Sequence, residues 1–381
     1  MRRWLASVLA LLAVPASAQE APAWIGVWEG RIGTYPVRLC IDSWGDQPAR
    51  GAYYYLSRLE PIALTEEEGG GGWVELAPDG EQQALWEFAE QTGTRLHGTW
   101  RQGRRSLPFD LKPAAWTSKE EDGPCGSDTF LVPRIAGGEM ISEPAELDGW
   151  RYTALTYRAP AHFAEELFLD SFAFAPERPG DTAILAALAK ELPAAGRSAP
   201  YLQCMGDSIA VNGRDGYYST ASKPLLVSPA WLVTLESYDI YCGGAHPSHG
   251  FFHRTFDRQS GEETKLARWL GERAIEHKSY EADEEGYDLV RPALRELILT
   301  RGISDGQPVE GEDESDEAEC REAAREQEFW TFGLSREGML FVPSLPHVIA
   351  ACQATYTVPW TDLAPFLNQA GRAGLARLRG G

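Results

Sequence analysis

Residues 241–257 read Tyr241-Cys242-Gly243-Gly244-Ala245-His246-Pro247-Ser248-His249-Gly250-Phe251-Phe252-His253-Arg254-Thr255-Phe256-Asp257. Two adjacent glycines allow the backbone a positive φ or a close approach to another segment. Three histidines follow them, and histidine is both the side chain that titrates near neutral pH and the commonest metal ligand. The stretch is therefore either a functional site or a rigid turn between two strands.

The spacing of these histidines favours the turn over a metal site. His246, His249 and His253 follow the pattern H-x-x-H-x-x-x-H, and they are the candidate zinc ligands of a metal-dependent envelope hydrolase. Pro247 and Gly250 disfavour the helix that usually presents such a spacing. In a strand, His246 and His249 would point to opposite faces. We predict no catalytic residue, no cofactor and no metal, and we keep the hydrolase as an alternative.

If the stretch is a turn, its glycines and histidines have structural roles. We expect Gly243 and Gly244 to form a tight or bulged strand end, and His246 to hydrogen-bond the loop. His249 and His253 would be surface residues of the strand that follows.

The amino terminus has the marks of a secretory signal peptide. Arg2 and Arg3 precede an apolar run over residues 5–14, which ends in Pro15-Ala16-Ser17-Ala18. A short basic region, an apolar core and an Ala-x-Ala site predict removal of residues 1–18, with cleavage after Ala18. The run is too short to span a bilayer, and no cysteine stands at the cleavage site. We expect a periplasmic or secreted protein without a membrane anchor.

All six cysteines fall in the expected mature chain, and none forms a C-x-x-C pair. In an oxidising compartment an even set without metal-site spacing indicates disulfides. Six cysteines permit many pairings, and we favour those that stay within the proposed domains. The predicted pairs are Cys40 with Cys125, Cys204 with Cys242, and Cys320 with Cys352.

The charge balance excludes one class of ligand. Removing residues 1–18 takes away two arginines and no acid, so 33 basic residues face 56 acidic ones and the net charge is −23. Such a charge repels nucleic acid and anionic membrane surfaces, but it speeds the encounter with a cationic partner. An acidic surface also simply keeps an exported protein soluble.

The amino-terminal module, residues 19–118, reads as an antiparallel sandwich or small barrel. Short apolar and aromatic runs over residues 24–112 are separated by Gly, Pro and Asp at hairpin-like intervals. The opening Trp24-Ile25-Gly26-Val27-Trp28-Glu29-Gly30 resembles the first strand of lipocalin-like barrels. That resemblance implies a ligand cup and leaves a small-ligand carrier as a second alternative, whereas buried Trp and Tyr usually pack a core.

A linker, residues 119–148, and an α+β domain, residues 149–381, complete the expected architecture. The domain should hold a mixed sheet and several helices. Asp181 would cap the first of these helices. The acidic segment 310–317 lacks the spacing of a calcium loop and reads as solvated. The expected helices span residues 183–192, 266–277, about 291–301 and 318–327, and the last begins near residue 360.

The central stretch also resembles a known family. Its signature residues are Tyr241, Gly243, Gly244, Ala245 and His246, followed by Asp257 and Gly261. They resemble the core motif of the domain-of-unknown-function 3298 family, and the similarity extends over residues 150–367. The family includes the extracellular domain of RsiV-type anti-sigma factors, which look like lysozyme receptors, and a domain of PdaC-type peptidoglycan deacetylases. The resemblance implies an exported, non-enzymatic cell-envelope binding protein whose partner is a cationic protein such as lysozyme, or peptidoglycan.

Overall fold

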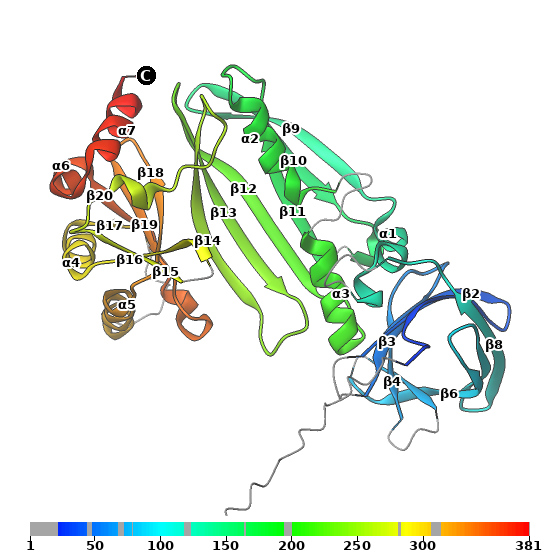
Figure 1. Ribbon diagram of the computed structural model, residues 1–381. Coiled ribbons are helices and arrows are strands. Elements are labelled where there is room, and N and C mark those ends of the chain that lie inside the picture. The colour runs from blue at the N-terminus through cyan, green and yellow to red at the C-terminus, as the bar shows by residue number, and fades with distance from the viewer. Residues whose placement is uncertain are drawn as a thin grey trace, which may run out of the picture.

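The fold divides into an amino-terminal barrel and a larger α+β part (Figure 1), which confirms the predicted fold class. The signal peptide expected over residues 1–18, its cleavage site after Ala18, and residues 310–313 of the acidic segment lie outside the described residues. Within those residues, no helix is long and apolar enough to cross a membrane. The computed structural model describes residues 22–43, 48–67, 72–77, 79–117, 123–163, 165–193, 200–280, 283–305 and 314–380.

Eight antiparallel strands close the barrel, because β1 pairs with both β2 and β8. The module is thus a small barrel and not a sandwich. Period-2 alternation sends every second side chain of these strands inward. The strands are β1 (Gly26–Ile32), β2 (Tyr35–Asp42), β3 (Arg50–Tyr55), β4 (Ile62–Glu66), β5 (Trp73–Leu76), β6 (Gln82–Gln91), β7 (Leu96–Gln102) and β8 (Arg105–Pro113).

Aromatic side chains pack the barrel around one buried acid. Glu75 is 3% exposed, and its Oε1 accepts hydrogen bonds from the Tyr53 hydroxyl at 2.7 Å and from the indole N–H groups of Trp86 and Trp100. Burial, reinforced by the Glu75 carboxylate, raises the pKa of Tyr53, so this hydroxyl stays protonated and donates. Most Trp and Tyr residues of the module are therefore core residues, as interior aromatics usually are, whereas Tyr35 is 46% exposed.

A six-stranded sheet with the order β14-β13-β12-β11-β10-β9 follows the barrel. It is mixed because β11 and β12 pair in parallel, whereas its other pairs are antiparallel. Two helices, α2 (Asp181–Leu188) and α3 (Pro200–Asn212), connect the parallel strands and lie along one face of the sheet (Figure 1). The strands are β9 (Glu139–Leu147), β10 (Trp150–Arg158), β11 (Leu167–Ala173), β12 (Tyr217–Val227), β13 (Trp231–Tyr241) and β14 (Ser248–Asp257).

A four-stranded sheet with the order β17-β20-β19-β18 lies beyond β14. Trp231 and Val233 of β13 share its hydrophobic core with Met339, Phe341 and Val358, so the two sheets pack against each other. Pro292 occupies the first turn of α4, where its missing N–H is not needed. The elements are β15 (Ile275–Tyr280), β16 (Asp283–Val290), α4 (Pro292–Arg301), β17 (Ile303–Ser304), α5 (Glu314–Glu326), β18 (Trp330–Leu334), β19 (Gly338–Pro343), β20 (Tyr356–Pro359), α6 (Trp360–Leu363) and α7 (Gln369–Arg379).

The six cysteines are joined in the three pairs that the sequence predicts. Cys40–Cys125 links β2 to a short 3₁₀ turn, η1 (Pro124–Gly126), before the second sheet. Cys204–Cys242 links α3 to the residue after β13, and Cys320–Cys352 links α5 to the 3₁₀ segment η5 (His347–Cys352). Three disulfides fit a protein that folds in an oxidising compartment.

Two expected segments differ from the structure. The expected helix over residues 266–277 is wrong: it is a 3₁₀ turn, η4 (Leu266–Trp269), followed by strand β15, because residues 275–280 pair with β16 and Gly271 interrupts the helical run. The described part of the expected linker holds helix α1 (Asp128–Ile135) and strand β9, which pairs along its whole length with β10. The apolar residues Phe130 and Leu131 of α1 are fully buried, which explains why this segment is ordered.

Asp181 does not cap α2. Its carboxylate instead accepts the backbone N–H groups of Glu177 and Arg178 and pairs with Arg258. The Asp181 carboxylate pairs with the Arg258 guanidinium and does not accept the N–H groups of the first turn of α2. Both side chains are buried, and a charge-assisted hydrogen bond is stronger than a neutral one.

Candidate functional site

The double-glycine stretch forms a sharp turn between β13 and β14. Gly243 has φ +91°, and a Cβ at this position would lie 2.8 Å from the Cα of Ser208 in α3. The side-chain amide of Asn212, also in α3, donates to the Gly243 carbonyl at 3.3 Å. With the Cys204–Cys242 disulfide beside it, this turn is clamped onto α3, and only glycine fits at position 243.

The three candidate metal ligands are not brought together. His246 and His249 are exposed and pack on His347 of η5, with ring centroids 4.7 and 5.4 Å apart. His253 lies four residues further along β14, about 13 Å from His249 at the rise of a strand. Within the part of the chain that the structure describes, no group of three or more His, Cys, Asp or Glu side chains is arranged to hold a metal ion.

His253 is buried and not a surface residue, which corrects the sequence-based expectation. Its exposed fraction is 7%, because Gly333 of β18 lies directly against it. A Cβ on Gly333 would be 2.7 Å from the His253 Cβ. The absence of a side chain at position 333 thus makes room for the imidazole between the two sheets.

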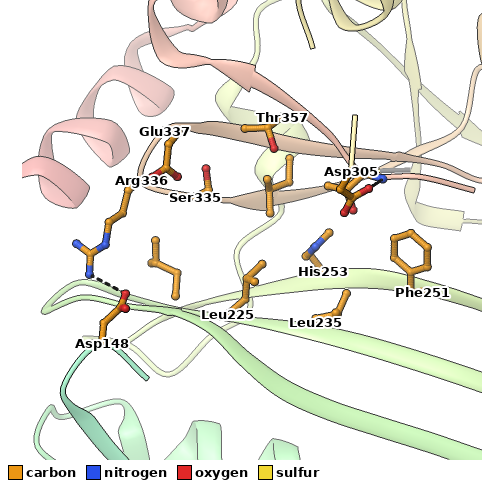
Figure 2. A pocket seen from close by; sticks show the side chains of 13 residues that line it. Asp148, Leu225, Leu235, Phe251, His253, Asp305, Ser335, Arg336, Glu337 and Thr357 are labelled. Atoms are coloured by element: carbon orange, nitrogen blue, oxygen red, sulfur yellow. Dashed lines mark hydrogen bonds and ion pairs between the residues drawn. The ribbon is translucent and has the colours of Figure 1, made fainter. Parts of the chain in front are cut away.

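A cleft of about 540 Å³ opens between the two sheets where His253 lies. Strands β12, β13 and β14 form one wall, and the four-stranded sheet forms the other (Figure 2). Its volume is in the range of ligand sites, ~300–1,000 Å³. The lining residues are Asp148, Leu225, Leu226, Leu235, Phe251, His253, Asp305, Ser335, Arg336, Glu337, Leu340, Thr355 and Thr357.

Two hairpin turns meet at one end of the cleft. Asp148 and Gly149, with φ values of 49° and 81°, form the tight turn between β9 and β10. The carboxylate of Asp148 lies 3.9 Å from the guanidinium of Arg336, in the turn between β18 and β19. Both side chains are more than half exposed, so the pair is a weak latch between the two sheets.

The charged groups of the cleft are mostly acidic. Asp148, Asp305 and Glu337 contribute three carboxylates, and Arg336 contributes one guanidinium. Burial lowers the pKa of His253 to about 4, although the Asp305 carboxylate acts in the opposite direction, so the imidazole is neutral near pH 7. The cleft is thus an apolar groove with a net negative rim.

Of the residues that line the cleft, the sequence singles out only His253. Its residues come from the β9–β10 turn, from β12 to β14, and from the carboxy-terminal sheet, and no local motif joins these segments. The periodicity of apolar residues in a helix or strand predicts which face of that element is buried. It does not predict which distant segment packs against that face. Only the concentration of histidines after Gly244 pointed near this site.

No family model and no curated protein matches the sequence. Among solved structures, the chain is similar to a DUF3298 family protein from Pseudomonas aeruginosa PAO1, with 14% identity, a TM-score of 0.33, and coverage of 61% of this chain and 94% of that one. It is also similar to a member of that family from Bacteroides fragilis, with 13% identity, a TM-score of 0.32, and coverage of 64% and 96%. Both of these proteins are described as members of the family whose core motif residues 243–246 resemble.

Proposed function

We propose that this chain is an exported binding protein of the cell envelope that engages a cationic envelope hydrolase such as lysozyme. The observation that carries the proposal is the cleft between the two sheets, with three carboxylates against one guanidinium in a chain of net charge −21. The disulfides support an exported location. The neutral imidazole of His253 and the apolar side chains of the cleft fit binding better than proton transfer near pH 7.

Electrostatics explains how such a protein would find its partner. A net charge of this size creates an attractive field for a basic protein and raises the association rate. The field is screened over a Debye length of roughly 10 Å at 0.1 M salt, so the gain falls as salt is added. Charges that line the contact then fix orientation and exclude partners with the wrong charge pattern.

Binding to lysozyme in a salt series tests this function. Between about 50 and 500 mM salt we expect affinity to fall about tenfold or more, because the acidic surface is progressively screened. The double variant Asp148→Asn/Glu337→Gln should bind more weakly than the native chain at low salt. The matched control Glu296→Gln/Glu319→Gln removes the same charge from exposed positions on α4 and α5, outside the cleft, and should bind nearly as the native chain does.

Two results would contradict the proposal. One is the absence of lysozyme binding even at low salt. The other is equal binding to lysozyme and to an unrelated basic protein such as cytochrome c, which would reduce the effect to general charge. If the first result is accompanied by retention on purified peptidoglycan, the partner moves from a protein to the cell wall.

A further inference from the structure

We infer that one end of the cleft, formed by His253, Asp305 and Phe251, is a subsite for the guanidinium or ammonium group of an arginine or lysine side chain. This inference rests on the proposed function and names the chemistry by which a basic partner would be held. Figure 2 shows the three residues gathered at the end of the cleft opposite the Asp148–Arg336 latch. Three different features of these residues favour a cation.

His253 supplies a buried polar atom that lacks a partner. The ring lines the cleft, and its Nδ1 is buried without a hydrogen-bond partner among the described residues. Native proteins rarely leave a buried polar atom in this state, and a bound ligand is one common explanation. The ring is neutral near pH 7, so one nitrogen carries the hydrogen and the other accepts a hydrogen bond; in the tautomer with the hydrogen on Nε2, the acceptor is Nδ1. An N–H group of a ligand satisfies that requirement.

Asp305 supplies the negative charge, and its position is fixed. Its backbone N–H donates to the Thr355 carbonyl at 3.0 Å, and its Oδ1 accepts the Thr355 N–H at 2.7 Å. These two bonds hold the carboxylate at the edge of the cleft. Hydrogen bonds between a carboxylate and a cationic N–H group are roughly twice as strong as neutral ones. An anionic ligand would instead meet this carboxylate and be repelled.

Phe251 supplies an aromatic face on a backbone that is also fixed. The side-chain amide of Gln353 bonds to both its N–H, at 3.2 Å, and its carbonyl, at 3.3 Å, as a neighbouring strand would. An aromatic ring attracts a cation placed within about 6 Å of its centre. The apolar floor of the cleft, which includes Leu225, Leu235 and Leu340, can cover the aliphatic stem of a lysine or arginine.

The opposite end of the cleft already holds a positive charge. There the guanidinium of Arg336 lies 3.9 Å from the Asp148 carboxylate, with Glu337 next to Arg336 in the chain. A basic side chain of the partner is therefore expected beside Asp305, with its neighbouring residues extending toward the latch.

Two matched peptides test the subsite directly. N-acetyl-Leu-Ala-Arg-amide carries the cation, and the same peptide with citrulline in place of arginine has nearly the same shape without the charge. In calorimetric titrations of the mature chain we expect the arginine peptide to bind about tenfold more tightly than the citrulline peptide. Equal binding of the two peptides, or no binding of either, would overturn the inference.

Three variants locate the effect. Asp305→Asn keeps an oxygen for the Thr355 N–H and should reduce the preference for arginine about fivefold, whereas Glu296→Gln on α4 should leave it unchanged. His253→Phe keeps a ring at this position and removes the unpartnered nitrogen, so it should weaken binding of the arginine peptide without lowering the unfolding temperature. A variant chain that loses stability but keeps its affinity would show that His253 is only structural and would contradict its role.

The test separates this inference from the proposed function. Lysozyme binding by a chain that does not distinguish the two peptides would leave the function standing and remove the subsite. Arginine-specific peptide binding by a chain that does not bind lysozyme would keep the subsite and remove the proposed partner.

Discussion

Arg134→Met is expected to lower the free energy of unfolding by about 3–5 kcal/mol. The guanidinium is fully buried, and it bonds both oxygens of Asp215, at 2.8 and 2.5 Å. Its Nε donates to the carbonyl of Leu59 in the barrel at 2.7 Å. The variant leaves the Asp215 carboxylate, which is 7% exposed, without its charged partner. An unpaired buried charge is the main source of the loss.

This residue also holds the barrel against the rest of the chain. Leu59 has φ +67°, a conformation that is uncommon for a residue with a branched side chain, and its carbonyl is bonded to Arg134. Arg134 lies on helix α1 and Asp215 lies just before β12, so one guanidinium connects the barrel to two segments of the α+β part. Loss of Arg134 should therefore loosen the barrel as well as destabilise the chain.

Urea unfolding followed by tryptophan fluorescence measures the effect of Arg134→Met. The control is Arg158→Met, which breaks an exposed ion pair with Glu139 and should change stability little. The double variant Arg134→Met/Asp215→Leu removes both charges and should recover much of the loss. If Arg134→Met proves no more destabilising than Arg158→Met, the buried pair does not hold the two parts together.

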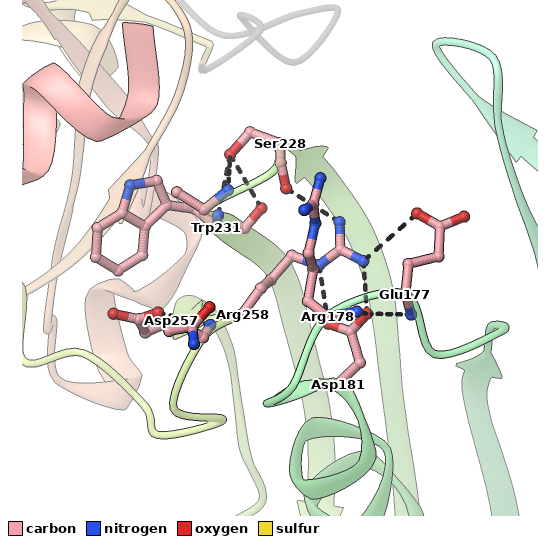
Figure 3. Close-up of polar contacts among 9 residues, drawn as sticks. Glu177, Arg178, Asp181, Ser228, Trp231, Asp257 and Arg258 are labelled. Atoms are coloured by element: carbon pink, nitrogen blue, oxygen red, sulfur yellow. Dashed lines mark hydrogen bonds and ion pairs between the residues drawn. The ribbon is translucent and has the colours of Figure 1, made fainter. Parts of the chain in front are cut away.

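Asp181→Ala should cost a similar free energy of unfolding, about 3–5 kcal/mol, at neutral pH. Figure 3 shows the network around this carboxylate. Arg258 donates to it from Nε at 2.9 Å and from Nη2 at 2.6 Å, and donates from Nη1 to the Ser228 carbonyl at 3.0 Å. The exposed fractions are 0% for Asp181 and 3% for Arg258, so the variant would leave the buried guanidinium with only the exposed Glu177 carboxylate, 4.0 Å away, as a counter-ion.

The same pair predicts a specific loss of stability in acid. Burial raises the pKa of Asp181, but Arg258 and the backbone N–H groups of Glu177 and Arg178 outweigh burial and leave the pKa below its usual value. A carboxyl with a lowered pKa in the folded state stabilises the protein above its unfolded pKa, about 3.9, and this contribution is lost as pH falls through the folded value. Protonation of Asp181 should therefore destabilise the native chain below about pH 4.

Urea midpoints measured from neutral pH into acid test the assignment. Asp181→Asn should start less stable than the native chain and lose less further stability in acid, because it has no carboxyl to protonate. The control Asp239→Asn removes an exposed aspartate on β13 and should follow the native curve closely. An acid profile of Asp181→Asn parallel to that of the native chain would contradict a stabilising role for the charged carboxylate.

The sequence predicts well those features that depend on local pattern. The antiparallel β module follows from short alternating strands with turn residues between them, although this pattern leaves a sandwich and a barrel open. The disulfides follow from the compartment, and their pairing follows from joining segments that are expected to be neighbours. Helix α4 begins at Pro292 as the proline predicts. These features can be predicted without knowing which distant segments are in contact.

The remaining features depend on which segments meet in space. The apolar residues of the segment 266–277 have the spacing of a helix, but residues from 275 onward form strand β15 because they pair with β16. Helix α3 was not predicted; Gly206 weakens its helical pattern, yet a glycine is needed there because a Cβ would lie 2.3 Å from the Cα of Gly126. His249 and His253 lie on the same face of β14, and only His253 is covered by Gly333.

Hydrogen exchange of residues 19–381, with and without saturating lysozyme, shows whether the cleft receives the partner. We expect slower exchange on binding in β13, β14 and the turn at residues 335–337, which line the cleft, with the barrel strands β1–β8 unchanged. Protection confined to the barrel, or no protection in any segment at low salt, would contradict the claim that this cleft receives a cationic partner.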